Sequence, residues 1–363
     1  MPVGTQGTVK TLHPDDLVDL GSQIILGNTY HLNLRPGLEV IRAGKGLHKF
    51  SSWDKPILTD SGGFQVWSLS KLRKISEKGV EFRNHLDGSK MMMSPEDSME
   101  IQATLGSDIA MLFDECPPYP CDEKYAEDSL ALTTRWAKRC KTWHVENSAK
   151  IVPWMTDPSL LGTENLKLET HQRQLMFGIV QGSTFAHLRE RSAKELIEIG
   201  FDGYAVGGIS VGEPEHEMIR AIDNAVPHLP EDKPRYAMGL GTPPQMLEMI
   251  ARGVDMFDCV MPTRVARHGL AHTLDGPIHI KNKPFELDQR PLTEDTHPSI
   301  RRFSRSYIRH LYRAKESLAM RLLSFHNLHF YLRLMEQARE AIDNGTFTEF
   351  KDAFITRYNA NSK

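Results

Sequence analysis

The chain has 363 residues, of which 40% are hydrophobic and 25% are charged, and its net charge is −3. This balance is ordinary for a globular protein, and it argues against a basic protein that coats nucleic-acid duplexes. No apolar run approaches the roughly 18 residues that span a bilayer, so we expect no membrane association, and Met1–Gly7 lacks signal-peptide features. The cysteines show no disulfide-scaffold spacing, so we expect reduced thiols and a cytoplasmic location.

Short apolar runs alternate with longer amphipathic stretches along most of the chain. Strands are predicted at 23–26, 56–59, 109–113, 175–180, 204–206, 235–239 and 255–257. Helical patterns occur at 193–199, 214–226 and 243–253. Strands that alternate with helices predict βαβ units and a parallel sheet.

A polar residue or a glycine follows nearly every predicted strand. These positions are Asn28, Asp60, Asp114, Gln181, Gly207–Gly208, Met238–Gly239 and Asp258. A (β/α)₈ barrel carries its site at the carboxyl ends of all its strands, whereas a doubly wound sheet gathers ligand groups at one switch point. The pattern therefore favours an α/β fold of the (β/α)₈ TIM-barrel type.

We place the barrel at residues 1–269, with a truncated first strand and a polar, irregular insertion at about 141–172. The remainder, 270–363, is expected to be a mainly helical C-terminal subdomain that opens with a hairpin around Asp275-Gly276. A long helical region from 304 to about 340 and the residues before it are rich in arginine. Such arginines either form a solvated helix face or contact an RNA backbone.

Asp60 and Asp258 both end apolar, strand-like runs. Two carboxylates at one site suit chemistry at a sugar C1′, because one can attack the anomeric carbon while the other moves a proton. The surrounding segments resemble the tRNA-guanine transglycosylase family. The matching stretches, in the family's order, are 2–10, 26–32, 58–65, 113–116, 181–183, 205–208, 238–241 and 257–264.

The resemblance implies exchange of the wobble guanine in tRNAs with G-U-N anticodons (Tyr, His, Asn and Asp types) during queuosine biosynthesis. It makes Asp258 the nucleophile that forms a glycosyl-aspartate and Asp60 the general acid/base. The target nucleotide must be flipped out of its stack to reach the carboxylate.

The resemblance also assigns residues to the incoming base and to the tRNA. Phe64 and Met238 would sandwich the flat base, where the family more often has tyrosine in place of Phe64. Cys116 and Val211 favour the smaller 7-aminomethyl-7-deazaguanine, and incorporation of queuine is the alternative. Base contacts are expected from Asp114, Gln181, Ser61, Gly208 and Ile209, and tRNA contacts from Arg264 and Arg267.

The family's C-terminal zinc site normally has three cysteines and a histidine. The corresponding stretch here, 291–304, has no cysteine, and only His326 remains of the ligand set, with His297 and Asp295 as poor substitutes. Tetrahedral zinc wants four ligands, so we predict no zinc and no other cofactor. The family's homodimer, which this region supports, is a possible assembly.

Other function classes fit parts of the sequence. The segment Gly208–Gly212 matches the G-x-S-x-G elbow of serine hydrolases around Ser210. A glycosidase could use the same two aspartates, but it would not need Asp114 and Gln181. A non-catalytic tRNA-binding paralogue or partner subunit would need neither aspartate.

Overall fold

In the computed structural model, which describes residues 1–69, 73–151 and 174–360, seven parallel strands form one sheet with the order β1-β2-β6-β7-β8-β9-β10. Most of their residues are buried, as expected for strands that are covered on both faces. They are β1 (Ile25–Gly27), β2 (Ile57–Thr59), β6 (Ile109–Met111), β7 (Leu175–Val180), β8 (Gly203–Val206), β9 (Arg235–Ala237) and β10 (Met256–Phe257). Each corresponds to one of the predicted strands.

The segment Pro2–Gly4 lies between the two ends of this sheet. Val3 forms a parallel bridge with Leu26 of β1, and Pro2 forms one with Cys259, two residues after β10. The Gly4 N–H donates to the Leu26 carbonyl at 2.7 Å. The curled sheet confirms the predicted (β/α)₈ barrel type of fold.

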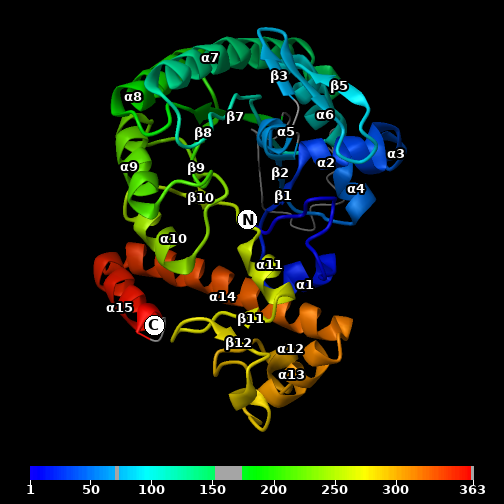
Figure 1. Cartoon of the computed structure of the whole chain (residues 1–363), viewed down its shortest axis with the longest axis vertical. Coiled ribbons are helices and arrows are strands. Elements are labelled where there is room, and N and C mark those ends of the chain that lie inside the picture. Colours follow the sequence, from blue (N-terminus) through cyan, green and yellow to red (C-terminus); the bar gives the residue numbers. More distant parts are fainter. Residues whose placement is uncertain (70–72, 152–173, 361–363) are drawn as a thin grey trace, which may run out of the picture.

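Helices surround the strands in Figure 1. Residues close in the sequence fix the helix ends, as α6 illustrates. Ser94 forms a capping box with Asp97 at the start of α6, and Pro95 occupies its first turn. Gly106 ends the helix in a left-handed conformation. No helix among the described residues is both long and apolar enough to cross a membrane. The barrel-region helices are α1 (Pro14–Asp19), α2 (Thr29–Leu32), α3 (Leu38–Ala43), α4 (Leu47–Ser51), α5 (Gly63–Leu69), α6 (Pro95–Leu105), α7 (Glu123–Glu146), α8 (Ala186–Ile199), α9 (Glu215–Ala225), α10 (Pro243–Ile250) and α11 (Met261–Arg267).

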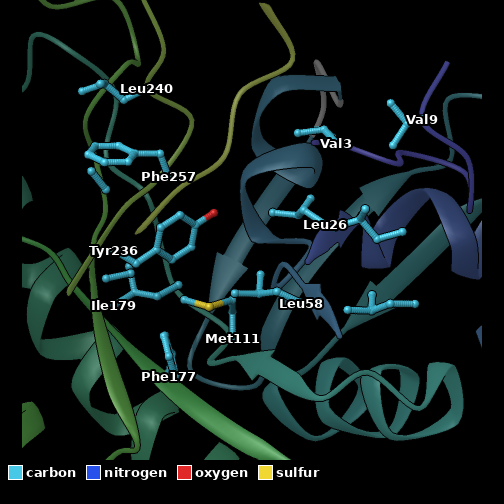
Figure 2. Packing of buried hydrophobic residues seen from close by; sticks show 14 of the residues in the cluster. Val3, Val9, Leu26, Leu58, Met111, Phe177, Ile179, Tyr236, Leu240 and Phe257 are labelled. Atoms are coloured by element: carbon cyan, nitrogen blue, oxygen red, sulfur yellow. The ribbon is translucent and has the colours of Figure 1, made fainter. Parts of the chain in front are cut away.

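The barrel interior is filled by apolar side chains from successive strands. Figure 2 shows Leu58, Met111 and Ile179 packed around the ring of Tyr236. All four side chains are fully buried. Tyr236 differs from the other three side chains, because its hydroxyl places a hydrogen-bond donor among these apolar groups.

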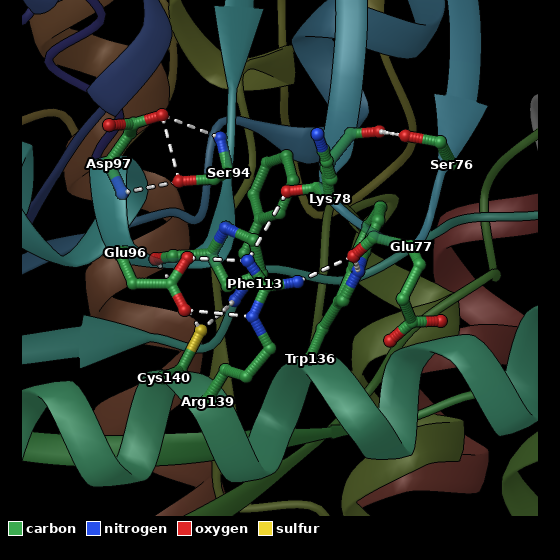
Figure 3. Close-up of polar contacts among 12 residues, drawn as sticks. Ser76, Glu77, Lys78, Ser94, Glu96, Asp97, Phe113, Trp136, Arg139 and Cys140 are labelled. Atoms are coloured by element: carbon green, nitrogen blue, oxygen red, sulfur yellow. Dashed lines mark hydrogen bonds and ion pairs between the residues drawn. The ribbon is translucent and has the colours of Figure 1, made fainter.

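A second sheet, which the sequence patterns did not predict, consists of β3 (Arg73–Ser76), β4 (Gly79–Arg83) and β5 (Lys90–Met93) in antiparallel order. Its β3–β4 turn is held against α7, as Figure 3 shows: Arg139 and Trp136 both donate to the Glu77 carbonyl, at 2.5 and 3.0 Å. Trp136 in turn stacks on Phe113, with 5.1 Å between ring centroids. The small sheet therefore supports the residue that precedes Asp114.

The C-terminal part contains the expected hairpin and a helical group packed below the barrel (Figure 1). The predicted helical region from 304 to about 340 consists of two helices, because Lys315 adopts a left-handed conformation (φ +61°) between them. The prediction of an irregular segment from 141 is wrong at its start, since α7 continues to Glu146, and 152–173 lie outside the described residues. The elements are β11 (Leu270–Ala271), β12 (Ile278–His279), α12 (Pro298–Arg301), α13 (Arg305–Arg313), α14 (Ser317–Asp343) and α15 (Phe347–Asn359).

Candidate active site

Three carboxylates and an amide follow barrel strands at their carboxyl ends. Asp60 follows β2, Asp114 lies three residues after β6, Gln181 follows β7, and Asp258 follows β10. Because parallel strands bring these ends to one side of the barrel, the four side chains share what we call the barrel mouth. Gln181 Nε2 donates to Asp114 Oδ2 at 2.7 Å, and the charge of Asp258 acts on Asp60.

Asp60 is buried and accepts several hydrogen bonds. Its Oδ1 accepts from the Thr29 N–H at 2.8 Å, and its Oδ2 accepts from Gln65 Nε2 at 2.8 Å and from Asn28 Nδ2. Burial raises the pKa of Asp60 to about 7; the Asp258 charge adds to the increase, and the hydrogen bonds oppose it. A carboxyl group with a pKa near neutrality can both donate and accept a proton within one reaction cycle.

Asp258 is held through one of its two oxygens. The Tyr236 hydroxyl donates to Oδ1 at 2.5 Å, and the Gly239 N–H donates to the same oxygen at 2.7 Å. No hydrogen bond to Oδ2 occurs within the described part of the chain. The carboxylate is therefore fixed in direction while one oxygen stays available, which suits a nucleophile.

Asp114 and Gln181 form a buried polar pair beside Ser61. Asp114 Oδ1 accepts from the Ser61 hydroxyl at 3.0 Å, and Gln181 Oε1 is buried with no hydrogen-bond partner. Burial raises the pKa of Asp114 to about 6, and the Glu115 charge contributes to that increase. A buried acceptor without a donor is unfavourable, so this arrangement is suited to a ligand that brings N–H groups.

The loop after β8 borders this polar pair. Ile209 is buried, Gly208 and Val211 are half-buried, and the Glu213 carboxylate accepts the N–H groups of Ser210 and Val211 at 2.5 and 2.9 Å. Burial raises the pKa of Cys116 well above its usual value, and the Gly208 N–H, which interacts with the thiol, lowers it in part. Cys116 thus lies as a neutral thiol beside this loop.

The two predicted stacking residues lie in different surroundings. Phe64, in the first turn of α5, is 40% exposed, which is unusual for a large aromatic ring. Met238, directly after β9, is half-buried against the barrel core. Phe64 follows the strand end that carries Asp60, and Met238 precedes Gly239, which contacts Asp258.

The two predicted tRNA-binding arginines lie on α11, the helix that begins three residues after Asp258. Arg264 is exposed, and Arg267 is half-buried with its Nη1 donating to the Thr263 carbonyl at 2.9 Å. Burial lowers the pKa of Arg267, and the nearby charge of Arg264 lowers it further. Two close cations without carboxylate partners among the described residues form a basic rim next to the nucleophile.

Three site residues escaped the sequence analysis: Tyr236, Arg189 and Glu213. Tyr236 sits inside a strand pattern, where a tyrosine is read as core. Arg189 occupies a helix whose other charged residues are exposed or half-buried, and only its full burial distinguishes it. Glu213 could have been found, because an acidic residue shortly after a glycine-rich loop can accept its free N–H groups.

The serine-hydrolase alternative gains no geometric support. Ser210 is exposed, and no hydrogen bond of the described residues joins its hydroxyl to a histidine. A nucleophile elbow needs a base within hydrogen-bond reach of the serine.

The C-terminal residues do not fit a tetrahedral zinc site. His326 is buried, and its Nε2 interacts with the His272 carbonyl at 2.8 Å. His297 Nδ1 interacts with the Ser299 hydroxyl at 2.8 Å, and the Asp295 carbonyl interacts with His329. Among the described residues, no group of three or more His, Cys, Asp or Glu side chains could hold a metal ion. His326 Nδ1 is buried with no hydrogen-bond partner, but the described residues do not gather around it the further ligands that tetrahedral zinc needs.

Comparison with known proteins identifies the family. The family model described as queuine tRNA-ribosyltransferase matches residues 1–360. Proteins named queuine tRNA-ribosyltransferase from Pelotomaculum thermopropionicum and Natranaerobius thermophilus are 51% and 50% identical over 359 and 360 residues, covering 99% of this chain and 90% of each relative. The protein of that name from Staphylococcus aureus is 50% identical over 365 residues, covering 99% of this chain and 89% of its own length. A barrel mouth with these carboxylates and these matches together show that the chain belongs to the queuine tRNA-ribosyltransferase (tRNA-guanine transglycosylase) family.

Proposed function

We propose that the protein replaces the wobble guanine of tRNA with a 7-deazaguanine base in queuosine biosynthesis, through a covalent glycosyl-aspartate at the barrel mouth. The observation that carries this proposal is the pairing of Asp60 and Asp258 at one end of the barrel. Asp258 has one fixed and one available oxygen, and Asp60 has a pKa of about 7. Family membership supports the same reaction.

In the first step, Asp258 Oδ2 attacks C1′ of the flipped nucleotide while the C1′–N9 bond breaks. The electron pair of that bond goes to guanine, whose N9 takes the proton held by Asp60. In the second step, Asp60 accepts the N9 proton of the incoming base, this nitrogen attacks C1′, and the Asp258–sugar bond breaks. Each carboxyl group returns to its starting state, and the glycosidic configuration is retained.

The incoming base is proposed to lie over Asp114 and Gln181, between Phe64 and Met238. Its ring N–H and exocyclic amine would donate to the Asp114 carboxylate, and Gln181 would share the polar edge with the backbone at Gly208 and Ile209. We propose that the incoming base is 7-aminomethyl-7-deazaguanine rather than queuine, because the Val211 side chain would occupy space that the bulkier queuine needs. The matched relatives carry queuine in their names.

We propose that the tRNA substrates carry G-U-N anticodons (Tyr, His, Asn and Asp types) and that Arg264 and Arg267 hold the bases that flank the target. Arginine can stack on a splayed base and donate several hydrogen bonds to it. A cytoplasmic location fits a tRNA substrate and four free cysteines. We also propose that the protein forms a homodimer and that its C-terminal subdomain contains no zinc.

The test is incorporation of radiolabelled guanine into tRNA with a G-U-N anticodon, compared between the wild-type protein and Asp258→Asn. We expect exchange with the wild type, and loss of exchange in the variant with its melting temperature nearly unchanged. A shifted protein–tRNA band on a denaturing gel would report the covalent intermediate. Labelling that persists in Asp258→Asn would remove Asp258 as nucleophile, and no labelling by the wild type would overturn the proposed reaction.

A further inference from the structure

A buried arginine lies under the loop that borders the base site. Arg189 of α8 is 0% exposed, and its hydrogen bonds to described residues all go to backbone carbonyls. Burial lowers the pKa of Arg189 to about 10, so the guanidinium remains charged at neutral pH. A buried cation without a carboxylate partner is unfavourable and therefore needs a reason.

The carbonyls that Arg189 binds belong to two neighbouring strand ends. Nε donates to Ser183 at 2.8 Å, and Nη1 donates to Val180 at 3.0 Å and to Gly207 at 2.7 Å. Nη2 reaches the Gly208 carbonyl at 3.4 Å. One guanidinium thus joins the end of β7, where Gln181 begins the loop, to the end of β8.

These bonds fix which way two peptide groups face. In a trans peptide, the C=O of one residue and the N–H of the next point in opposite directions. Since the Gly207 and Gly208 carbonyls point at Arg189, the N–H groups of Gly208 and Ile209 point away from it.

The Gln181 side chain lies directly on the same glycine pair. A Cβ added to Gly207 would come within 2.7 Å of Gln181 Nε2, and one added to Gly208 within 2.8 Å of Gln181 Oε1. The glycine pair therefore lies against both Arg189 and the amide that contacts Asp114. A shift of the pair would move both the N–H donors and the amide.

We propose that Arg189 is a positioning residue that sets base specificity: it holds the Gly207–Gly208 backbone so that the Gly208 and Ile209 N–H groups demand an acceptor on the six-membered ring of the base. The inference rests on the proposed function and extends it. A base with a ring carbonyl at that edge, such as guanine, is accepted. A base with an amino group there would set donor against donor and is rejected.

The test compares Arg189→Lys and Arg189→Met with Arg191→Met as the matched control. Lysine keeps the charge, but its single nitrogen cannot make all four contacts that the guanidinium shares among Nε, Nη1 and Nη2, and methionine removes all donors. Arg191 lies on the same helix but is exposed and pairs with Glu127 and Glu195. The readouts are the KM for guanine, the KM for tRNA, and the preference for guanine over 2,6-diaminopurine, which carries an amino group in place of the ring carbonyl.

We expect both Arg189 variants to raise the KM for guanine about tenfold or more and to lower the preference for guanine by a similar factor. The KM for tRNA should change less than about twofold, and Arg191→Met should match the wild type. Folded Arg189 variants that keep the guanine KM and preference would overturn the proposal, as would a parallel rise of both KM values.

If Arg189→Met does not fold, the test is made with Arg189→Lys alone. A lysine variant that also fails to fold would count against the proposal, because a role confined to base positioning leaves the barrel intact. If the wild type itself does not label tRNA with guanine, the proposed reaction fails instead. The two failures are therefore distinguishable.

Discussion

The Tyr236 hydroxyl donates a hydrogen bond to Asp258 Oδ1 at 2.5 Å, from inside the barrel core to the residue that follows the neighbouring strand. Burial raises the pKa of Tyr236 well above its usual value, and the charge of Asp258 raises it further. Tyr236 therefore stays protonated and remains a donor at neutral pH. With the Gly239 N–H it occupies one carboxylate oxygen and leaves the other without a hydrogen bond from the described residues.

Replacing Tyr236 with phenylalanine should lower kcat by about 10- to 100-fold, because a buried hydrogen bond to a charged group contributes about 1.5–3 kcal/mol. The ring that packs in the core is kept, so the KM for tRNA and the melting temperature should change little. Tyr204→Phe is the control, since Tyr204 is a buried strand tyrosine on β8 whose hydroxyl accepts only from the Phe201 N–H among its described contacts. Equal rates in both variants would show that Tyr236 is only a packing residue.

The pKa of Asp60 predicts an inverse dependence of stability on pH at this site. The folded-state pKa of about 7 lies above the ordinary value of 3.8. The contribution of Asp60 to stability is therefore fully present below about pH 3.8 and is lost as pH rises through about 7. Asn at this position keeps the shape without the charge.

Asp60→Asn should accordingly gain stability relative to the wild type as pH rises from 5 to 8, by about 2–3 kcal/mol in the free energy of unfolding. Denaturant unfolding at both pH values measures this difference. Asp223→Asn, which alters an exposed carboxylate paired with Arg252, should show no such trend. A difference between Asp60→Asn and wild type that stays constant from pH 5 to 8 would contradict the raised pKa.

Much of this site was visible in the sequence, because its residues stand directly after apolar runs. Asp60, Gln181 and Asp258 each follow a strand whose buried residues are easily recognised, and a parallel barrel brings such ends together. The sequence could not show which residue each side chain points toward. The role of Tyr236 depends on its hydroxyl meeting a residue 22 positions away, and that pairing follows from strand register and not from any local pattern.

The parts of the fold that escaped prediction have similar causes. The β3–β4–β5 sheet is rich in charged residues, and its attachment depends on α7 side chains such as Arg139 that are distant in the chain. The break before α14 rests on Lys315, a residue that rarely adopts a positive φ, so no glycine marked it. Arg189 resembles an exposed helix arginine until the strand ends are folded around it.

Val211 is predicted to restrict the size of the incoming base. Val211→Gly should raise the rate of queuine incorporation about tenfold or more while changing the rate with 7-aminomethyl-7-deazaguanine less, because removing the side chain opens room beside the loop. Val211→Ala should give a smaller gain. No gain with queuine in either variant would mean that Val211 does not select the base.

Arg267 is predicted to act on tRNA rather than on the base. Arg267→Met should raise the KM for tRNA about tenfold, and it should leave the KM for guanine unchanged, because the side chain lies on the rim beyond Asp258. Arg252→Met is the control, since Arg252 is paired with Glu248 and Asp223 away from the rim. An unchanged KM for tRNA would mean that the Arg264–Arg267 pair has no role in tRNA binding.

The C-terminal subdomain is predicted to be stable without zinc, because side chains join the segments that a metal would otherwise hold. Arg305 donates to the carbonyls of Pro291 and Leu292 and pairs with Asp288 at 3.1 Å. Purified protein should therefore contain no stoichiometric zinc, and a chelator should leave the melting temperature unchanged. One equivalent of bound zinc would contradict this.

The same contacts predict where this subdomain is vulnerable. Arg305→Met should lower the free energy of unfolding by about 2–3 kcal/mol, because it leaves the half-buried Asp288 short of a partner and frees two carbonyls. Arg301→Met is the matched control, since Arg301 is exposed and has no ion-pair partner among the described residues. Equal stability of the two variants would mean that Arg305 does not hold the 291–292 segment, and a metal or another contact would have to be sought in its place.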